Sequence, residues 1–157
     1  GHDRWPHVNT AFALLFLSKG RTPVVISKLV HGNWSEGRVE WDNDWNNDRN
    51  DLRHLTEHIA REGSLFGKKP LAWQTYDIMR ALYARSPRPG AKEDDEIIAD
   101  MRQSPILYFN GHKSPLRRFQ DRENTLIKRF LENGGFLVAE ACCGSKDFDD
   151  GIKEWVK

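Results

Sequence analysis

The fold of this chain is decided by the stretch GGFLVAEACCGS, residues 134–145. An apolar run typical of a strand follows two glycines and ends in a carboxylate, two adjacent cysteines and a further glycine. Helices are predicted on either side, over 118–133 and from about 147, because apolar residues recur on one side of each segment. Upstream, the run ILYF at 106–109 is a second apolar strand. Alternating helices and fully apolar strands predict an α/β domain with a parallel sheet covered by helices.

The rest of the chain is interpreted as a helix, a linker and the start of this α/β domain. The segment NTAFALLFLSKG at 9–20 is apolar on every side, so it is predicted to pack inside something larger. We interpret 21–37 as a linker, with one short strand at 24–26 as an alternative, and 38–157 as the N-terminal part of the α/β domain. Within that part we expect a strand at 38–41, a helix at 51–62, a strand in 70–78, a surface loop at 83–96 and a short helix at 94–101. The chain has no initial Met and its last residues are typical of the middle of a helix, so we expect a piece of a longer protein.

Composition excludes several classes of partner. With 24 basic and 23 acidic residues the formal net charge is +1, which gives no electrostatic basis for a nucleic-acid partner or for binding to an anionic membrane. The longest apolar run, 11–17, is far shorter than the roughly 20 residues that span a bilayer. Both cysteines are adjacent, so no disulfide joins distant parts of this chain. A small ligand or a protein remains as the partner, and the oligomeric state is open.

Polar side chains follow the two clearest strands at the point where each one ends. In a doubly wound sheet, ligands bind in the crevice beyond the carboxyl ends of the strands. If the strands are neighbours, one crevice brings together the residues that we expect to bind a ligand: Asn110, Gly111, His112, Glu140, Cys143 and Gly144.

Cys142 has two interpretations. The chain must turn from the strand into the next helix, and a cysteine at that turn lies near a helix N-terminus, whose partial positive charge favours a thiolate. Cys142 would then be a catalytic nucleophile with His112 as its base. In the alternative, Cys142 is a small buried apolar residue at the end of a strand.

No segment predicts a metal site or an identifiable cofactor. HLTEH at 54–58 matches the H-x-x-E-H pattern of zinc peptidases, but with Leu52, Leu55 and Ile59 facing the core both imidazoles point to solvent. DNDWNNDRND at 42–51 lacks the glycine and glutamate of a calcium loop, and is predicted to cap the helix after it. GSLFGKK at 63–69 has the wrong spacing for a phosphate-binding loop. HKSPLRRF at 112–119 is basic and is interpreted as a solvated loop, with an anion site as the alternative.

Residues 104–155 resemble a bacterial family called domain of unknown function 4159. The resemblance lies in a strand ending in Gly-His at 111–112, Leu131 before Gly-Gly-Phe-Leu at 134–137, Glu140 with Cys142, and Phe-Asp at 148–149. WDNDWNNDRNDLRHL, upstream, is similar to the start of that family. The resemblance therefore covers residues 38–157.

The resemblance implies a flavodoxin-like fold of the class I glutamine-amidotransferase-like group, incomplete at its C-terminus. In amidotransferases a Gly-x-Cys-x-Gly turn holds the nucleophile; here Cys142 stands at the cysteine position and Glu140 replaces the first glycine. The opening helix is similar to the last helix of a prenyltransferase or squalene-cyclase-like α/α toroid, which implies an exported protein of the periplasm or cell envelope. We therefore expect a ligand-binding or interaction module of a larger envelope protein, with a cysteine hydrolase or amidotransferase-like enzyme as the alternative.

Overall fold

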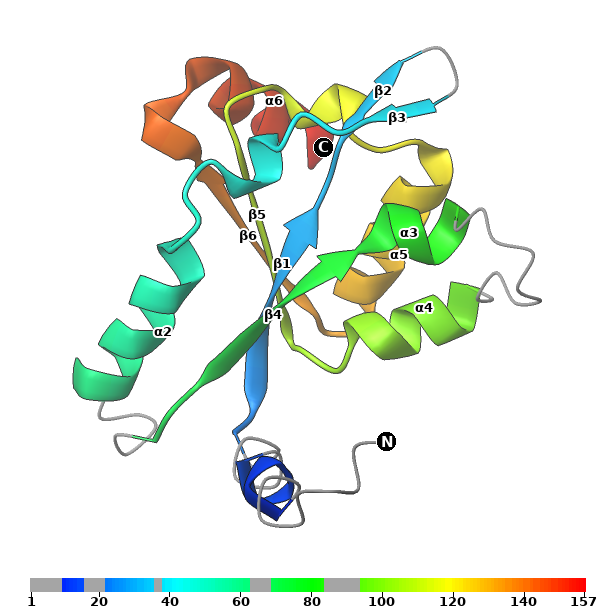
Figure 1. The fold of residues 1–157 in the computed structure, drawn as a ribbon. Coiled ribbons are helices and arrows are strands. Elements are labelled where there is room, and N and C mark those ends of the chain that lie inside the picture. Colours follow the sequence, from blue (N-terminus) through cyan, green and yellow to red (C-terminus); the bar gives the residue numbers. More distant parts are fainter. Residues whose placement is uncertain (1–9, 16–21, 36–37, 63–68, 84–93) are drawn as a thin grey trace.

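Four parallel strands form the central sheet (Figure 1). The computed structural model describes residues 10–15, 22–35, 38–62, 69–83 and 94–157. In spatial order the strands are β4 (Ala72–Asp77), β1 (Val24–Val30), β5 (Ile106–Gly111) and β6 (Phe136–Ala141). The predicted α/β class is confirmed: helices flank an all-parallel sheet, as in a flavodoxin-like three-layer fold.

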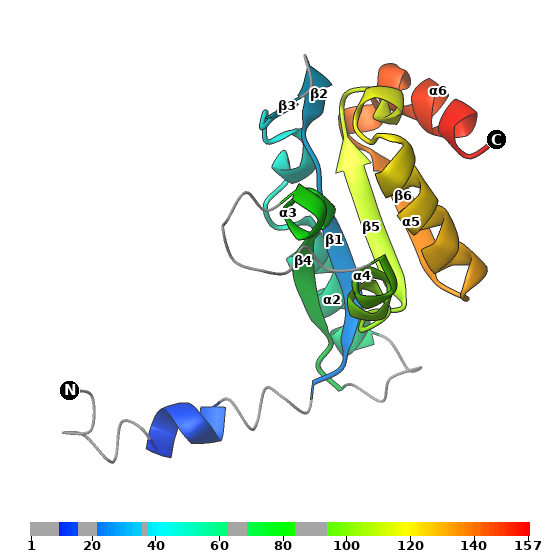
Figure 2. The ribbon, with the colours of Figure 1, turned by 90° about the vertical axis from the view of Figure 1, so that its right-hand side faces the viewer.

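Helices cover both faces of this sheet (Figures 1 and 2). On one face α2 (Asp51–Glu62) buries Leu52 against Ile26 and Tyr108. The larger core lies on the other face, where Leu29, Leu107 and Phe109 meet side chains from four helices. These helices are α3 (Ile78–Tyr83), α4 (Asp94–Met101), α5 (Asp121–Glu132) and α6 (Lys146–Trp155).

The strand order places a topological switch point between β1 and β5. Numbered along the chain, the parallel strands lie in the order second, first, third, fourth, so the direction of sheet growth reverses at β1. The helix after β1 and the helices after β4 lie on opposite faces, as a doubly wound sheet requires (Figure 1). A ligand crevice is therefore expected beyond Val30 and Gly111.

β1 is an inner strand, whereas the sequence predicted a linker over 21–37 with at most a short strand. It pairs with β4 along nearly its whole length and with β5 from Ile26 to Lys28. Lys28 interrupts the apolar pattern, yet its side chain is only 1% exposed because Nζ lies 2.6 Å from Asp51 Oδ2. A buried lysine is tolerated where a carboxylate pairs with it. The linker predicted up to residue 37 thus contains an inner strand.

β6 lies at the edge of the sheet formed by the described strands. Leu137 and Ala141 pack against the main core, but Phe136 is 69% exposed and Val138 is also exposed. The chain enters β6 through Gly135, where a Cβ atom would come within 2.2 Å of the buried Phe130 ring. Glycine is therefore required at this entry.

Short elements surround the carboxyl ends of the strands. A hairpin of β2 (Asn33–Ser35) and β3 (Arg38–Glu40) follows β1 and leads to the 3-10 turn η1 (Asp44–Asn46). Two further turns follow the next strands: η3 (Pro115–Arg117) comes after β5, and η4 (Cys142–Gly144) comes after β6. The strand predicted at 38–41 therefore belongs to this hairpin and not to the main sheet.

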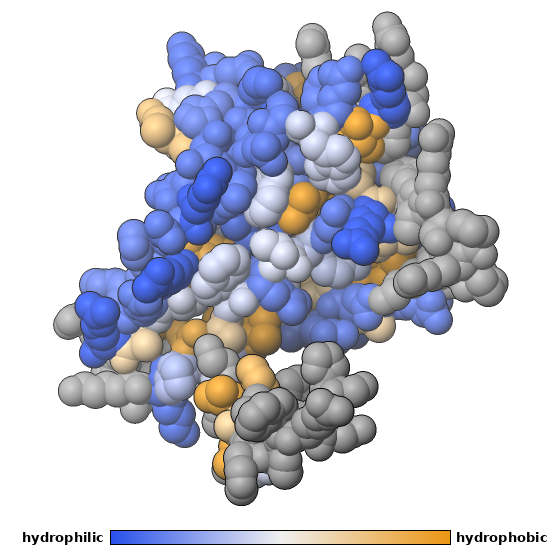
Figure 3. All heavy atoms as spheres, viewed as in Figure 1, coloured by the Kyte–Doolittle hydropathy of each residue, from blue (hydrophilic) through white to orange (hydrophobic). Residues whose placement is uncertain are grey.

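Apolar side chains of the helix at 10–15 are exposed. Phe12 is 67% exposed, and Leu14 and Leu15 are exposed as well. Figure 3 shows apolar atoms gathered at this lower end of the molecule, while the part beyond the strand ends is mostly hydrophilic. The rest of the predicted helix, most of GSLFGKK and most of the predicted loop at 83–96 lie outside the described residues. Within the part that is described, no helix combines the length and apolarity needed to cross a membrane.

Candidate functional site

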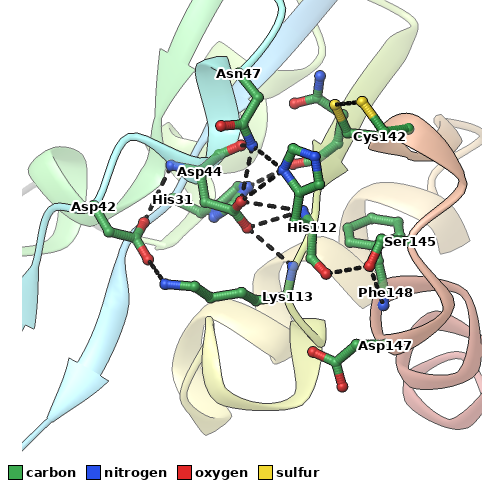
Figure 4. A network of polar contacts seen from close by, with 12 residues as sticks. His31, Asp42, Asp44, Asn47, His112, Lys113, Cys142, Ser145, Asp147 and Phe148 are labelled. Carbon is green, nitrogen blue, oxygen red and sulfur yellow. Dashed lines mark hydrogen bonds and ion pairs between the residues drawn. The ribbon is translucent and has the colours of Figure 1, made fainter.

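The candidate site lies where β5 and β6 end. The two strands pair in parallel, with Asn110 opposite Glu140 and Gly111 opposite Ala141. The condition set for a shared crevice, that these strands are neighbours, is therefore met. The residues that follow, His112 on one side and Cys142 on the other, emerge at the same edge of the sheet (Figure 4).

His112 is held at both its backbone and its ring. Its backbone N–H donates to the two carboxylate oxygens of Asp44, each 3.1 Å away, and the N–H of Lys113 donates to the same carboxylate at 3.2 Å. The ring Nδ1 lies 2.7 Å from Asn47 Nδ2 and 3.4 Å from Asp44 Oδ1. The side chain is 41% exposed. The turn η1 thus orients the imidazole and leaves it accessible to solvent.

Asp44 is the centre of a buried ionic network. Arg118, 1% exposed, donates to Asp44 at 3.2 Å and to both oxygens of Asp42 at 3.1 Å. Burial by itself would raise the pKa of Asp44, but hydrogen bonds from Asn47, His112 and Lys113 and the charge of Arg118 lower it. Asp44 is therefore an anion in the folded protein at neutral pH.

The two cysteines form the turn after β6. Cys143 has φ 54° and ψ 22°, a left-handed conformation that few residues with a side chain adopt. Its Sγ lies 3.9 Å from Cys142 Sγ. Cys142 is buried and Cys143 is exposed. Ser145 then accepts a hydrogen bond from Phe148 N and begins α6, as expected for a strand-to-helix turn.

The Cys142 thiol is not activated. Burial raises its pKa, and the neighbouring Cys143 and the negative charges of Glu140 and Asp48 raise it further, to about 11. This direction favours the second interpretation of Cys142, a small buried residue at the end of a strand, over a thiolate at a helix N-terminus. The Nδ1 atom of His112 contacts Asn47, and the Cys142 thiol contacts the Cys143 sulfur.

The three residues with metal-binding or nucleophilic side chains nevertheless gather at one point. One ligand atom each from His112, Cys142 and Cys143 lies within 4.8 Å of the other two. In Figure 4 the His112 imidazole lies close to Cys142. Among the described residues, these three side chains are close enough together to hold one metal ion.

The other residues predicted to bind a ligand have two different surroundings. Asn110 and Gly111 are buried: the Asn110 amide donates to Asp51 at 2.8 Å, and a Cβ atom at Gly111 would lie 2.7 Å from Asp44 Oδ2. Glu140 is exposed and accepts a hydrogen bond from the Tyr108 hydroxyl. Gly144 is exposed, with φ +70°. Asn110 and Gly111 thus support the site, while Glu140 and Gly144 are accessible to a ligand.

The match to a family model covers the whole sheet. Residues 25–157, from β1 to α6, match the family described as Domain of unknown function (DUF4159). The chain belongs to the DUF4159 family. No curated protein and no solved structure matches it. The family description names no activity, so the function of this DUF4159 domain has to be argued from its own residues.

A cleft adjoins the site of this DUF4159 domain. It has a volume of about 440 Å³ and opens beside Lys113, the neighbour of His112. Its lining is mixed in charge and consists of Asn33, Lys113, Ser114, Leu116, Arg118 and Asp147. Both basic side chains already form ion pairs. Lys113 Nζ lies 2.9 Å from Asp42, and Arg118 is paired with Asp42 and Asp44. The cleft is therefore suited to a polar ligand and offers no unpaired cation from these two residues.

The acidic segment contributes more than the predicted helix cap. Sequence reasoning assigned DNDWNNDRND to capping of α2, and did not identify Asp44 and Asn47 as partners of His112. The density of aspartate and asparagine before α2 was the available signal. His54 and His58 of HLTEH are both exposed, as predicted, although Leu55 of the predicted apolar stripe is exposed as well.

Proposed function

We propose that this DUF4159 domain binds a small ligand at the carboxyl edge of its sheet, as a ligand-binding or interaction module of a larger envelope-associated protein. The switch point between β1 and β5 supports this location. Three exposed or half-exposed groups, His112, Cys143 and Gly144, stand there beside the mixed-charge cleft.

One observation carries the choice of binding over catalysis. The Cys142 thiol is buried and has a pKa of about 11, so almost none of it is the nucleophilic thiolate at neutral pH. A nucleophilic cysteine needs the opposite, a pKa lowered by a nearby base or cation. Burial, the neighbouring Cys143 and the negative charges of Glu140 and Asp48 all raise the pKa of this thiol instead. The proposed role of Cys142 is therefore to shape the site.

The second candidate is a cysteine hydrolase or amidotransferase-like enzyme with Cys142 as nucleophile and His112 as base. The specific observation in its favour is the place of Cys142 at a strand-to-helix turn, with His112 nearby. Glu140 counts against it, because its negative charge opposes formation of a thiolate.

The two candidates differ in the reactivity of one sulfur. The Cys143→Ser variant leaves Cys142 as the only thiol, and its rate of alkylation by iodoacetamide is measured from pH 6 to 11, with Cys142→Ser as the matched control. If the domain is a ligand-binding module, Cys142 should be alkylated slowly, with an apparent thiol pKa above the roughly 8.5 of a free thiol. An apparent pKa well below that value, together with hydrolysis of a thioester or amide that Cys142→Ser abolishes, would overturn the binding function.

The exposed helix at 10–15 supports the link to a larger protein. Phe12 is 67% exposed and Leu14 is 62% exposed, as expected for the closing helix of a preceding α-helical domain of the α/α toroid kind. Changing Phe12 and Leu14 together to Ser should leave the stability of residues 22–157 unchanged, and should release helix 10–15 from the preceding domain in the full-length protein. Limited proteolysis of that protein measures the release; unchanged protection contradicts the assignment.

A further inference from the structure

We propose that His112, Cys142 and Cys143 form a binding site for a thiophilic divalent cation, with Zn²⁺ as the ion that the donors suit best. The inference rests on the proposed binding function and names the class of its ligand. It replaces the expectation from the sequence that the chain holds no metal site.

The spacing of the two sulfurs fits a tetrahedral ion. Zinc–sulfur bonds of about 2.3 Å at a tetrahedral angle separate two sulfurs by about 3.8 Å. The Sγ atoms of Cys142 and Cys143 are 3.9 Å apart, so both can ligate one ion with almost no movement. All three donor atoms lie within 4.8 Å of one another, and the half-exposed His112 has room to approach.

The backbone of the turn is what brings the sulfurs to one side. Adjacent residues of an extended strand point their side chains to opposite faces. Cys143 departs from this by adopting the left-handed region at φ 54°, and Gly144 follows at φ +70°. A left-handed conformation is unfavourable for a residue with a Cβ atom, and such strain concentrates at functional sites. Here the strained residue is one of the proposed ligands.

A second layer of residues orients the imidazole. Histidine ligands of metals usually donate their other ring nitrogen to a carboxylate or a carbonyl. The Nδ1 atom of His112 faces Asn47 at 2.7 Å and the Asp44 carboxylate at 3.4 Å, which leaves Nε2 for the ion. Without the ion, Nδ1 accepts a hydrogen bond from the Asn47 amide. When the ion takes Nε2, the ring proton moves to Nδ1, the Asn47 amide turns away from it, and the Nδ1–H group donates to Asp44. Asp44 is fixed in turn by Arg118 at 3.2 Å.

The donors select the ion. Two thiolates and one imidazole suit zinc, whereas calcium and magnesium prefer oxygen ligands. Binding releases both thiol protons to solvent, so the Zn²⁺ ion and the two thiolates have no net charge together. Three protein ligands leave the fourth tetrahedral position for water or an exogenous group, as in zinc sites that keep an open position.

Cobalt titration tests the site. The reduced, metal-free chain is titrated with Co²⁺ and then with Zn²⁺. A thiolate-to-cobalt charge-transfer band and the visible bands of tetrahedral cobalt are expected at one equivalent, with release of two protons per Co²⁺ ion bound. Zn²⁺ should then abolish these bands without further proton release. No charge-transfer band in the native chain overturns the proposal.

The variants locate the ligands. Cys142→Ser and Cys143→Ser should each weaken binding by roughly tenfold or more, and Asp44→Asn should do so through the second layer. His112→Gln should keep a weaker charge-transfer band. The control changes the exposed pair His54 and His58 to Gln and should bind like the native chain; equal affinity in Cys143→Ser, or loss in this control, shows an adventitious site only.

The outcomes separate the two proposals. Cys143 is exposed, so its serine variant tests the site even if Cys142→Ser fails to fold. An unreactive Cys142 without cobalt binding overturns the metal site and keeps the binding function. A reactive Cys142 with turnover overturns the binding function itself.

Discussion

Stability should fall steeply below neutral pH because of one buried histidine. His31 follows β1 and is fully buried, with Nε2 2.7 Å from the carbonyl oxygen of Asn110. Its ring stands edge-on to Phe109, with centroids 4.8 Å apart. Burial lowers the pKa of His31 from 6.5 to about 4, and the positive charge of Arg118 adds to this against the opposing effect of the Asn110 carbonyl.

The sign and size of the effect follow from linkage. Below about pH 6.5 the unfolded chain takes up a proton at His31 and the folded chain does not, so the free energy of unfolding falls as pH falls, until the folded pKa near 4 is reached. The whole difference corresponds to about 3 kcal/mol, and the part between pH 7.5 and pH 5 to about 2 kcal/mol. That is a large fraction of the stability of an ordinary domain.

Urea unfolding at pH 7.5 and pH 5 measures this loss. The matched variant is His31→Gln, whose amide can still donate to the Asn110 carbonyl but does not titrate. It should be less stable at pH 7.5, because the aromatic contact with Phe109 is lost, and should lose about 2 kcal/mol less than the native chain on going to pH 5. Equal pH dependence of the two proteins, or an NMR titration of His31 near pH 6.5, would refute the reasoning.

Three further predictions concern the network, the entry to β6 and the cysteine turn. Asp44→Asn should lower the free energy of unfolding by about 2 kcal/mol, and Asp42→Asn by about 1 kcal/mol. The difference is expected because Asp44 accepts hydrogen bonds from two backbone N–H groups as well as from a buried guanidinium. Urea unfolding measures both losses, and a larger loss in Asp42→Asn contradicts the central role of Asp44. Gly135→Ala should cost about 2 kcal/mol through the clash with Phe130, and an unchanged melting temperature would show that the ring yields. Cys143→Asn should keep or raise thermal stability by up to about 1 kcal/mol, since asparagine tolerates the left-handed region, while cobalt binding weakens by roughly tenfold or more, as for Cys143→Ser. A destabilised variant argues against backbone strain.

The sequence predicted those parts of the fold whose signal is local. Strands β5 and β6 and the helices α2, α4, α5 and α6 follow from apolar runs and helical periodicity, and parallel pairing of β5 with β6 follows from the helix between them. Strand β1 was underestimated because Lys28 stands in its middle. Its partner Asp51 comes 23 residues later, and no periodicity in one segment reveals such a pair.

The sequence also indicated part of the candidate site. Two neighbouring strand ends sufficed to place His112 beside Cys142. The role of Asp44 and Asn47 could not follow, because η1 reaches the site only through the crossover from β1 to β4, whose path depends on tertiary packing. The left-handed Cys143 was also beyond the sequence, since cysteine carries no propensity for that conformation.

The electrostatics of the turn explain why a cation and not a bare nucleophile suits it. Glu140 and Asp48 place negative charge near Cys142, and this charge raises the pKa of the thiol. A thiolate acting alone would have to form against that charge, which is the wrong environment for covalent catalysis. A divalent cation reverses the balance, because the same carboxylates attract it and it stabilises both thiolates at once. A buried, unreactive thiol and a strained vicinal cysteine pair are thus compatible in a single site once its ligand is positively charged.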